Sequence, residues 1–145
     1  MFRFRLERVL RYRRMREEHL EQECRHLHAT LQHEEEHLET LQATRRGQQE
    51  QLYMSQGSAL SGENLKLWHR YYQSLAQRAM TQESIVLKAT EALAAKRQEL
   101  LGARQKKMML EKLGEKAQER YLLEHSRRSQ RLVDETALAR LRYGR

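Results

Sequence analysis

The sequence predicts an all-α protein, a long antiparallel two-helix coiled-coil hairpin in which the second helix overhangs the first. None of the 145 residues is proline, and the strongest helix formers, Glu, Gln, Leu, Arg, Lys and Ala, dominate the chain. Apolar residues recur at heptad spacing on both sides of one glycine- and serine-rich stretch, residues 55–64. Isoleucine occurs once and valine three times, so strand-forming residues are scarce and no sheet is expected.

We expect a single coiled-coil domain over residues 1–145, with the first helix at about 3–54, the turn at about 55–63 and the second helix at about 64–141. In the first helix, a spacing of seven residues produces two apolar rows, which are the a and d positions of a heptad. One row holds Leu6, Leu20, Leu27 and Leu41, and the other holds Leu10, Cys24, Leu31, Leu38 and Leu52. Charged or polar residues such as Glu17, Glu34 and Arg45 interrupt these rows.

The turn is predicted from two glycines, Gly57 and Gly62, among three serines. A glycine can take the left-handed conformation that ends a helix, and a serine or asparagine can cap the helix that follows. Ser55, Ser58, Ser61 and Asn64 are the available capping residues.

The second helix has matching rows that face the first helix. One row holds Tyr72, Ala79, Val86, Leu93, Leu100, Lys107, Gly114 and Tyr121, and the other holds Leu75, Gln82, Ala89, Lys96, Ala103, Leu110 and Ala117. We expect the stems of Lys96 and Lys107 to lie along the seam with their charges in water. A bend near residue 59 would place Phe4 opposite residue 114 and leave about 25 residues of the second helix without a partner, or about 40 Å.

The net charge of +8 is unevenly distributed. Residues 1–16 carry seven arginines against Glu7, residues 17–50 carry nine glutamates against three arginines, and residues 120–145 carry seven arginines against three acids. In an antiparallel hairpin the two basic termini lie toward the same end. This basic end could bind nucleic acid or, through Phe2, Phe4, Leu6, Val9 and Leu10, a membrane surface. No asparagine is placed there for reading bases.

The sequence predicts a protein that is not an enzyme. It has no glycine-rich phosphate loop and no believable Ser/His/Asp arrangement, and its one cysteine, Cys24, fits a reducing compartment. No apolar run is long enough to span a membrane. His33, Glu34 and His37 match the H-E-x-x-H pattern of zinc proteases, but a Glu- and His-rich helix produces this string by chance. We therefore expect no catalytic residues, no cofactor and no metal.

Trp68, Tyr71 and Tyr72 form the densest aromatic patch, just after the bend, with Tyr53 and Met54 on the opposite arm. The simpler interpretation is a cluster that locks the turn. The alternative is a surface that docks a partner, because Trp and Tyr are favoured anchors at interfaces.

Three groups of residues carry a resemblance to a known family. The opening follows the pattern F-x-F-x-L-x-x-V-L-x-x-R, from Phe2 to Arg13, and W-x-x-Y follows the bend at Trp68 and Tyr71. The third group comprises Leu110-Glu111-Lys112-Leu113, Tyr121, Glu124 and Asp134-Glu135. With these motifs in this order, the chain resembles the flagellar type III export proteins of the FliJ family, over almost its whole length.

The resemblance implies a non-catalytic stalk in the pore of the hexameric flagellar export ATPase. It also implies contacts with the cytoplasmic domain of the export-gate membrane protein and with export chaperones. Nucleic acid is not an expected partner. The implied location is cytoplasmic, peripheral at the inner membrane near the flagellar base.

Two surfaces are assigned to these partners. The expected ring-binding residues are Arg8, Arg11, Arg13, Arg14, Arg127, Arg128 and Arg131. The expected gate-binding residues are Leu38, Leu41, Trp68, Tyr71 and Leu75.

Overall fold

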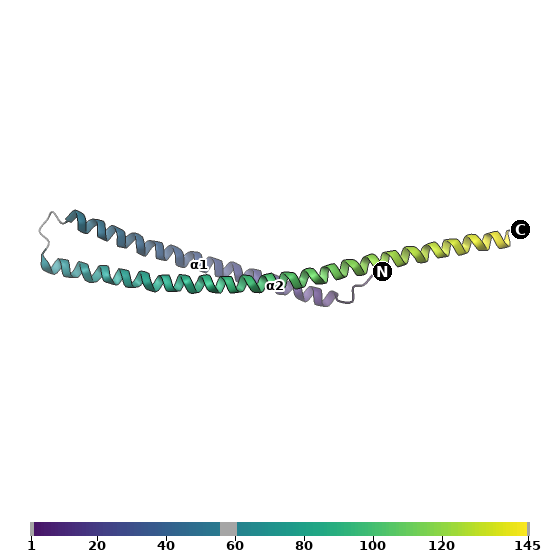
Figure 1. Cartoon of the computed structure of the whole chain (residues 1–145), viewed down its shortest axis with the longest axis horizontal. Coiled ribbons are helices and arrows are strands. Elements are labelled where there is room, and N and C mark those ends of the chain that lie inside the picture. Colours follow the sequence, from purple (N-terminus) through teal and green to yellow (C-terminus); the bar gives the residue numbers. More distant parts are fainter. Residues whose placement is uncertain (1, 56–60, 145) are drawn as a thin grey trace. The chain divides into compact units, whose positions relative to one another are not determined.

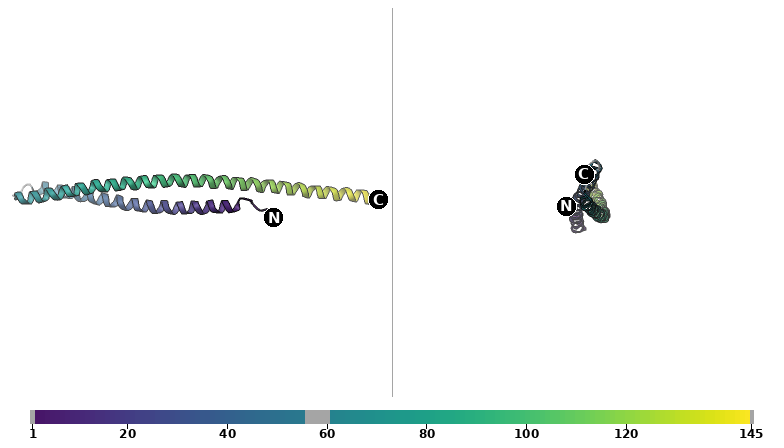
Figure 2. Two further views of the ribbon diagram at one scale, coloured as in Figure 1. Left: turned by 90° about the horizontal axis from the view of Figure 1, so that it is seen from below. Right: turned by 90° about the vertical axis from the view of Figure 1, so that its left-hand side faces the viewer.

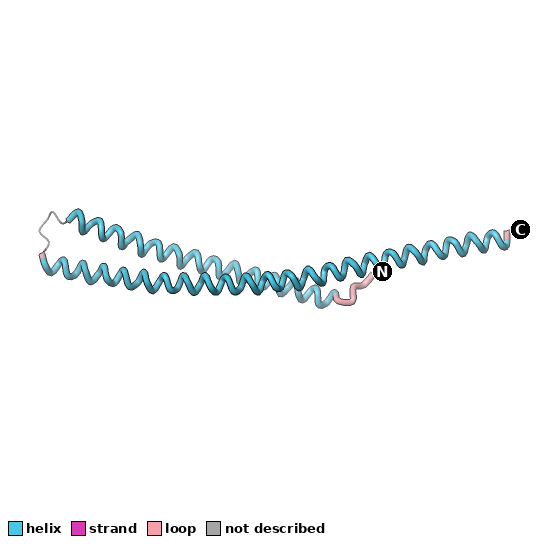
Figure 3. Tube along the Cα trace, in the orientation of Figure 1, coloured by secondary structure: helices cyan, strands magenta, loops and turns pink. Residues whose placement is uncertain are grey.

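A computed structural model describes residues 2–55 and 61–144. These residues form two helices, α1 (Glu7–Ser55, 49 residues) and α2 (Gly62–Tyr143, 82 residues). The helices pack against each other as a hairpin, and the second helix is the longer one (Figure 1). Within the described ranges there is no strand (Figure 3). The predicted fold class is confirmed.

The first helix begins at Glu7, later than the expected start near residue 3. The backbone N–H of Glu7 donates a hydrogen bond to the carbonyl of Phe4, 3.2 Å away, and the residues before this turn are not helical. The Phe2 ring lies 5.5 Å from the Tyr121 ring, and the Phe4 ring lies against Gly114. Residues two apart share a face in an extended segment but not in a helix, so docking both rings onto α2 favours a non-helical start.

The second helix begins with a serine cap. The Oγ of Ser61 accepts a hydrogen bond from the N–H of Asn64 at 3.3 Å, and its carbonyl accepts one from the N–H of Leu65 at 3.2 Å. This confirms the predicted serine capping. Gly62 is the first helical residue, and no glycine within the described ranges has a positive φ. The expected helix-ending Gly57, with Ser58, falls on residues 56–60, which lie outside the described residues.

The chain divides into two compact units, and each pairs a part of α1 with a part of α2 (Figure 2). The turn unit comprises residues 20–99, and the terminal unit comprises residues 1–19 and 100–145.

The core of the turn unit is a narrow seam. Leu20, which is 2% exposed, is its most buried side chain, and the other buried apolar residues are Cys24, Leu31, Leu75, Ala79 and Leu93. All six lie on the predicted heptad rows. Gln82 on the same rows is also buried, and its Nε2 donates hydrogen bonds to the carbonyl of Glu34 at 3.0 Å and to Oε2 of Glu34 at 2.5 Å. A polar residue is tolerated in the seam because its amide is satisfied.

The seam of the terminal unit is shorter. Leu10 and Glu17 are buried, and Phe4 lies opposite Gly114, as the position of the bend predicts. Leu6, by contrast, is 38% exposed, because it precedes the first turn of α1 and leaves the heptad register. After Tyr121 every described residue of α2 is exposed. The end of α2 after Tyr121 therefore has no covering partner among the described residues of its unit.

Candidate functional site

The predicted ring-binding arginines lie in the terminal unit, where they form two separate stretches. On α1, Arg8, Arg11 and Arg14 are exposed and Arg13 is half-buried, with its guanidinium 5.9 Å from the centre of the Tyr12 ring. The Nη2 of Arg14 lies 3.2 Å from Oε1 of Glu111 on α2. A carboxylate from α2 thus neutralises part of this first stretch.

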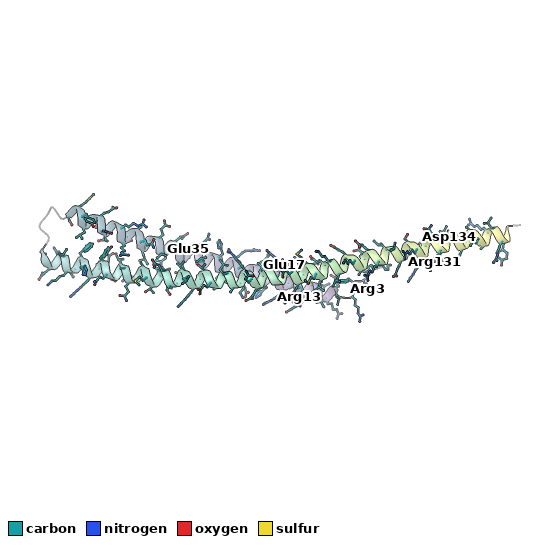
Figure 4. All side chains as sticks on the ribbon, viewed as in Figure 1. Arg3, Arg13, Glu17, Glu35, Arg131 and Asp134 are labelled. Carbon is teal, nitrogen blue, oxygen red and sulfur yellow. The ribbon has the colours of Figure 1, made fainter. Side chains whose placement is uncertain are left out.

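The second stretch is Arg127, Arg128 and Arg131 on the uncovered end of α2, where all three are exposed. Arg128 has only a long contact with Glu124, 3.9 Å. Because Arg14 pairs with Glu111, Arg14 lies about 24 Å along the helix from Arg127, and Arg8, six residues nearer the N-terminus, lies about 15 Å from it, at 1.5 Å per residue. Figure 4 shows Arg13 on α1 and Arg131 far along α2. The register of the helices therefore separates the arginines that the sequence treats as one paired end.

Glu17 holds the terminal unit together electrostatically. Its Oε2 lies 2.6 Å from Nζ of Lys107 and its Oε1 lies 3.3 Å from Nε of Arg104, although Glu17 is only 8% exposed. The hydrogen bond to Glu17 raises the pKa of Lys107 above its ordinary value. The expectation placed the Lys107 charge in water, and the structure adds a seam carboxylate as its partner.

Lys96 makes an equivalent contact in the turn unit. Its Nζ lies 3.2 Å from Oε2 of Glu23 and 3.3 Å from Oε2 of Glu99. The hydrogen bond to Glu23, the larger cause, and the hydrogen bond to Glu99 both raise the pKa of Lys96. The seven-residue periodicity identifies these seam lysines, but their partners become visible only once α1 and α2 are aligned.

The predicted gate-binding residues lie in the turn unit and differ in accessibility. Tyr71 is 45% exposed, Leu38, Leu41 and Trp68 are half-buried, and Leu75 is 3% exposed. The structure thus places Leu75 in the seam. A docking partner would reach the other four side chains but not Leu75.

The aromatic patch is ordered by stacking. The rings of Trp68 and Tyr72 lie 5.1 Å apart with an angle of 16° between their planes, and the guanidinium of Arg45 lies 5.0 Å from the centre of the Tyr72 ring. The Nε1 of Trp68 and the Nε of Arg45 are buried without a hydrogen-bond partner. The stack lies within α2, and the Arg45–Tyr72 contact crosses from α1 to α2, which is what a cluster that fastens the turn end would do.

The two histidines and the glutamate of the H-E-x-x-H string have different surroundings on α1. His33 and His37 are both exposed, off the seam, and Glu34 is engaged by Gln82. Across residues 2–55 and 61–144, no three His, Cys, Asp or Glu side chains gather closely enough to hold a metal ion.

A membrane-surface role for the N-terminus conflicts with the packing. Phe2 and Phe4 are turned onto α2, and Leu10 is 5% exposed. Three of the five side chains considered for membrane contact are thus already used within the terminal unit. No helix in the described part of the chain combines the length and hydrophobicity needed to cross a bilayer.

Comparison with known families gives one match. The model of the flagellar FliJ protein family matches residues 1–145. Among curated proteins and among solved structures, none matches the chain. A match over these residues, together with the long helical hairpin, decides the family. The chain belongs to the flagellar FliJ protein family and is a non-catalytic component of the flagellar export apparatus.

Proposed function

We propose that the chain is a stalk in the hexameric ring of the flagellar export ATPase, that it promotes the assembly and activity of the ring, and that it couples the ring to the export gate and to export chaperones. It would work at the cytoplasmic side of the flagellar base, held near the membrane only through its partners. The observation that carries the proposal is the uncovered end of α2 in the terminal unit.

This end combines basic side chains, of which Arg128 has one long contact, to Glu124 at 3.9 Å, with apolar side chains that no other described part of the unit covers. Leu122, Leu132 and Leu138 are 58%, 62% and 62% exposed, and Arg127 and Arg131 are exposed beside them. Burying a leucine gains about 1.5–3 kcal/mol. A channel lined with apolar and acidic groups would supply the burial and countercharge that the monomer lacks.

The mechanism follows from symmetry. The six subunits of a ring are equivalent, but two helices of unequal length cannot present the same face to each of them. Unequal contacts bias the conformational equilibria of the subunits differently. A protein without catalytic residues can thereby change the rate of ATP hydrolysis.

The decisive experiment reverses the charges on the uncovered end. The variant Arg127→Glu/Arg128→Glu/Arg131→Glu should lower stimulation of the ATPase about tenfold or more, the equivalent of about 1.4 kcal/mol of lost binding. A second variant, Arg8→Glu/Arg11→Glu, tests the stretch on α1 without disturbing the Arg14–Glu111 pair. Arg97→Glu, an exposed change in the turn unit, is the matched control. Normal stimulation by both basic-stretch variants would contradict the ring assignment.

The alternative function is a basic coiled-coil adaptor that binds nucleic acid, because the packing of Phe2, Phe4 and Leu10 disfavours the membrane-surface version. Seven arginines in the first 16 residues keep nucleic acid as a candidate. A binder of this kind should shift a labelled duplex with a steep dependence on salt. A ring stalk predicts no such shift at physiological salt.

A further inference from the structure

The turn unit contains a groove whose two arginines, Arg70 and Arg78, take part in none of the contacts described above. It measures about 720 Å³ and lies between α1 and α2. Its lining residues are His37, Leu41, Arg70, Gln73, Ser74, Gln77, Arg78, Thr81 and Gln82.

Two arginines line the groove, and no carboxylate lines it. Between Glu63 and Glu83, α2 carries Lys66, Arg70 and Arg78 without a single acid. The nearby Glu34 carboxylate accepts a hydrogen bond from the neutral amide of Gln82 at 2.5 Å and keeps its negative charge, but it pairs with neither arginine. Elsewhere on the same helix, lysines and arginines pair with carboxylates, as Lys96 and Lys107 do.

Neither Arg70 nor Arg78 forms an ion pair with any described residue, and both are exposed. The amides and hydroxyls beside them add hydrogen-bond donors, and Leu41 adds an apolar contact from α1. Guanidinium groups bind carboxylates through two parallel hydrogen bonds. A groove of this chemistry suits a negatively charged segment that also has an apolar face.

We propose that this groove binds an acidic amphipathic helix of a partner protein, with carboxylates about eight residues apart. Arg70 and Arg78 are eight residues apart on α2, which corresponds to about 12 Å at 1.5 Å per residue. A helix laid along the groove has the same rise per residue, so glutamates eight positions apart match the axial spacing of the two arginines, and the long arginine side chains span the rotation of about 80° between residues eight apart on a helix. The inference rests on the proposed function at one point, where the acidic helix is assigned to a protein of the export apparatus.

The test uses synthetic helical peptides and no ATPase, so its failure and the failure of the stalk proposal are distinguishable. A labelled peptide with two glutamates eight residues apart is titrated with the chain by fluorescence anisotropy. Peptides with glutamine at both positions, or with the glutamates five residues apart, are the peptide controls. The eight-residue spacing should bind most tightly, and its affinity should fall as salt rises.

Variants assign the binding to the groove. The double variant Arg70→Glu/Arg78→Glu should lower the affinity for the acidic peptide at least about tenfold. Arg97 is an exposed arginine of the same unit outside the groove, and Arg97→Glu should change this affinity less than about twofold. A peptide with lysines in place of the glutamates should bind the doubly reversed variant better than the native chain. Circular dichroism checks that both variants keep their helices.

Three results would overturn the proposal. Equal losses in Arg97→Glu and in the doubly reversed variant would indicate general charge attraction. Unchanged binding in the doubly reversed variant would remove the groove from the interaction. A short oligonucleotide could displace the peptide and bind the native chain more tightly than the peptide does. If that binding depends on Arg70 and Arg78, the groove is assigned to nucleic acid.

Discussion

Oε2 of Glu17 lies 2.6 Å from Nζ of Lys107, and this contact joins the α1 and α2 segments of the terminal unit. The carboxylate sits at a seam position, where its side chain is 11% exposed, and that of Lys107 is 24% exposed. A charge that is this far removed from water depends on its partner. Two predictions follow from the pair.

Removing the lysine charge alone should destabilise the hairpin. Lys107→Met keeps the apolar stem but leaves Glu17 with Arg104 as its remaining cation, at 3.3 Å. We expect a loss of about 1–2 kcal/mol in the free energy of unfolding, measured by urea denaturation. The double variant Glu17→Leu/Lys107→Met removes both charges from the seam and should be at least as stable as the native chain. A double variant that is less stable than Lys107→Met would contradict this account.

The same pair predicts a pH dependence. The pKa of Lys107 is raised from 10.5 by its hydrogen bond to Glu17, so the folded state binds this proton more tightly than the unfolded state does. The resulting stabilisation is fully present below pH 10.5 and is lost as the pH rises through the folded pKa. The stability difference between the native chain and Lys107→Met should therefore stay constant from neutral pH to about pH 10 and shrink above it. Urea titrations at several pH values test this, and a difference that grows above pH 10.5 would contradict it.

Apolar burial should matter in the seam and not on the uncovered end of α2. Leu20→Ala removes a side chain that is 2% exposed and should cost about 2–4 kcal/mol. Leu122→Ala makes the same leucine-to-alanine change at a position that is 58% exposed, and it should change the free energy of unfolding by less than about 0.5 kcal/mol. Thermal melts followed by circular dichroism measure both. Equal losses would mean that the end of α2 is covered in solution.

Two helical glycines should be replaceable with a gain in stability. Gly102→Ala should add about 0.8–1 kcal/mol from helix propensity alone, because a Cβ there meets nothing within 4 Å. At Gly114 the Cβ would lie 3.5 Å from the Phe4 ring, an ordinary contact. Gly114→Ala should therefore stabilise at least as much as Gly102→Ala. A loss of stability at Gly114 alone would show that the Phe4 ring needs the bare backbone.

Much of the fold follows from periodicity. The heptad rows identify the seam positions of both helices, including the polar members Glu17 and Gln82, because burial on a long helix repeats with the heptad. The register between the helices follows from the position of the bend, which places Phe4 opposite Gly114. The start of α1 does not follow from periodicity, because the Phe2 and Phe4 rings take part in a long-range contact that local helix propensity ignores.

The functional surfaces are less predictable from residue types. The terminal arginines are evident from composition. Whether they lie close together depends on how α1 pairs with α2. Arg14 is paired with Glu111, and Arg127 lies far along α2 from that pair. Leu75 and Leu41 are both leucines on the predicted heptad rows, yet Leu75 is buried and Leu41 is only half-buried. The groove beside Arg70 and Arg78 does not follow from the heptad rows, because most of its lining residues lie off those rows.

The sequence by itself determined the two helices, the seam positions and the family, because all three depend on spacing along one chain. Only the tertiary structure decided which charges are neutralised, which apolar side chains stay exposed, and where α1 and α2 leave a cationic groove between them. Those properties depend on atoms that lie dozens of residues apart in sequence, and their positions become defined when the two helices pack.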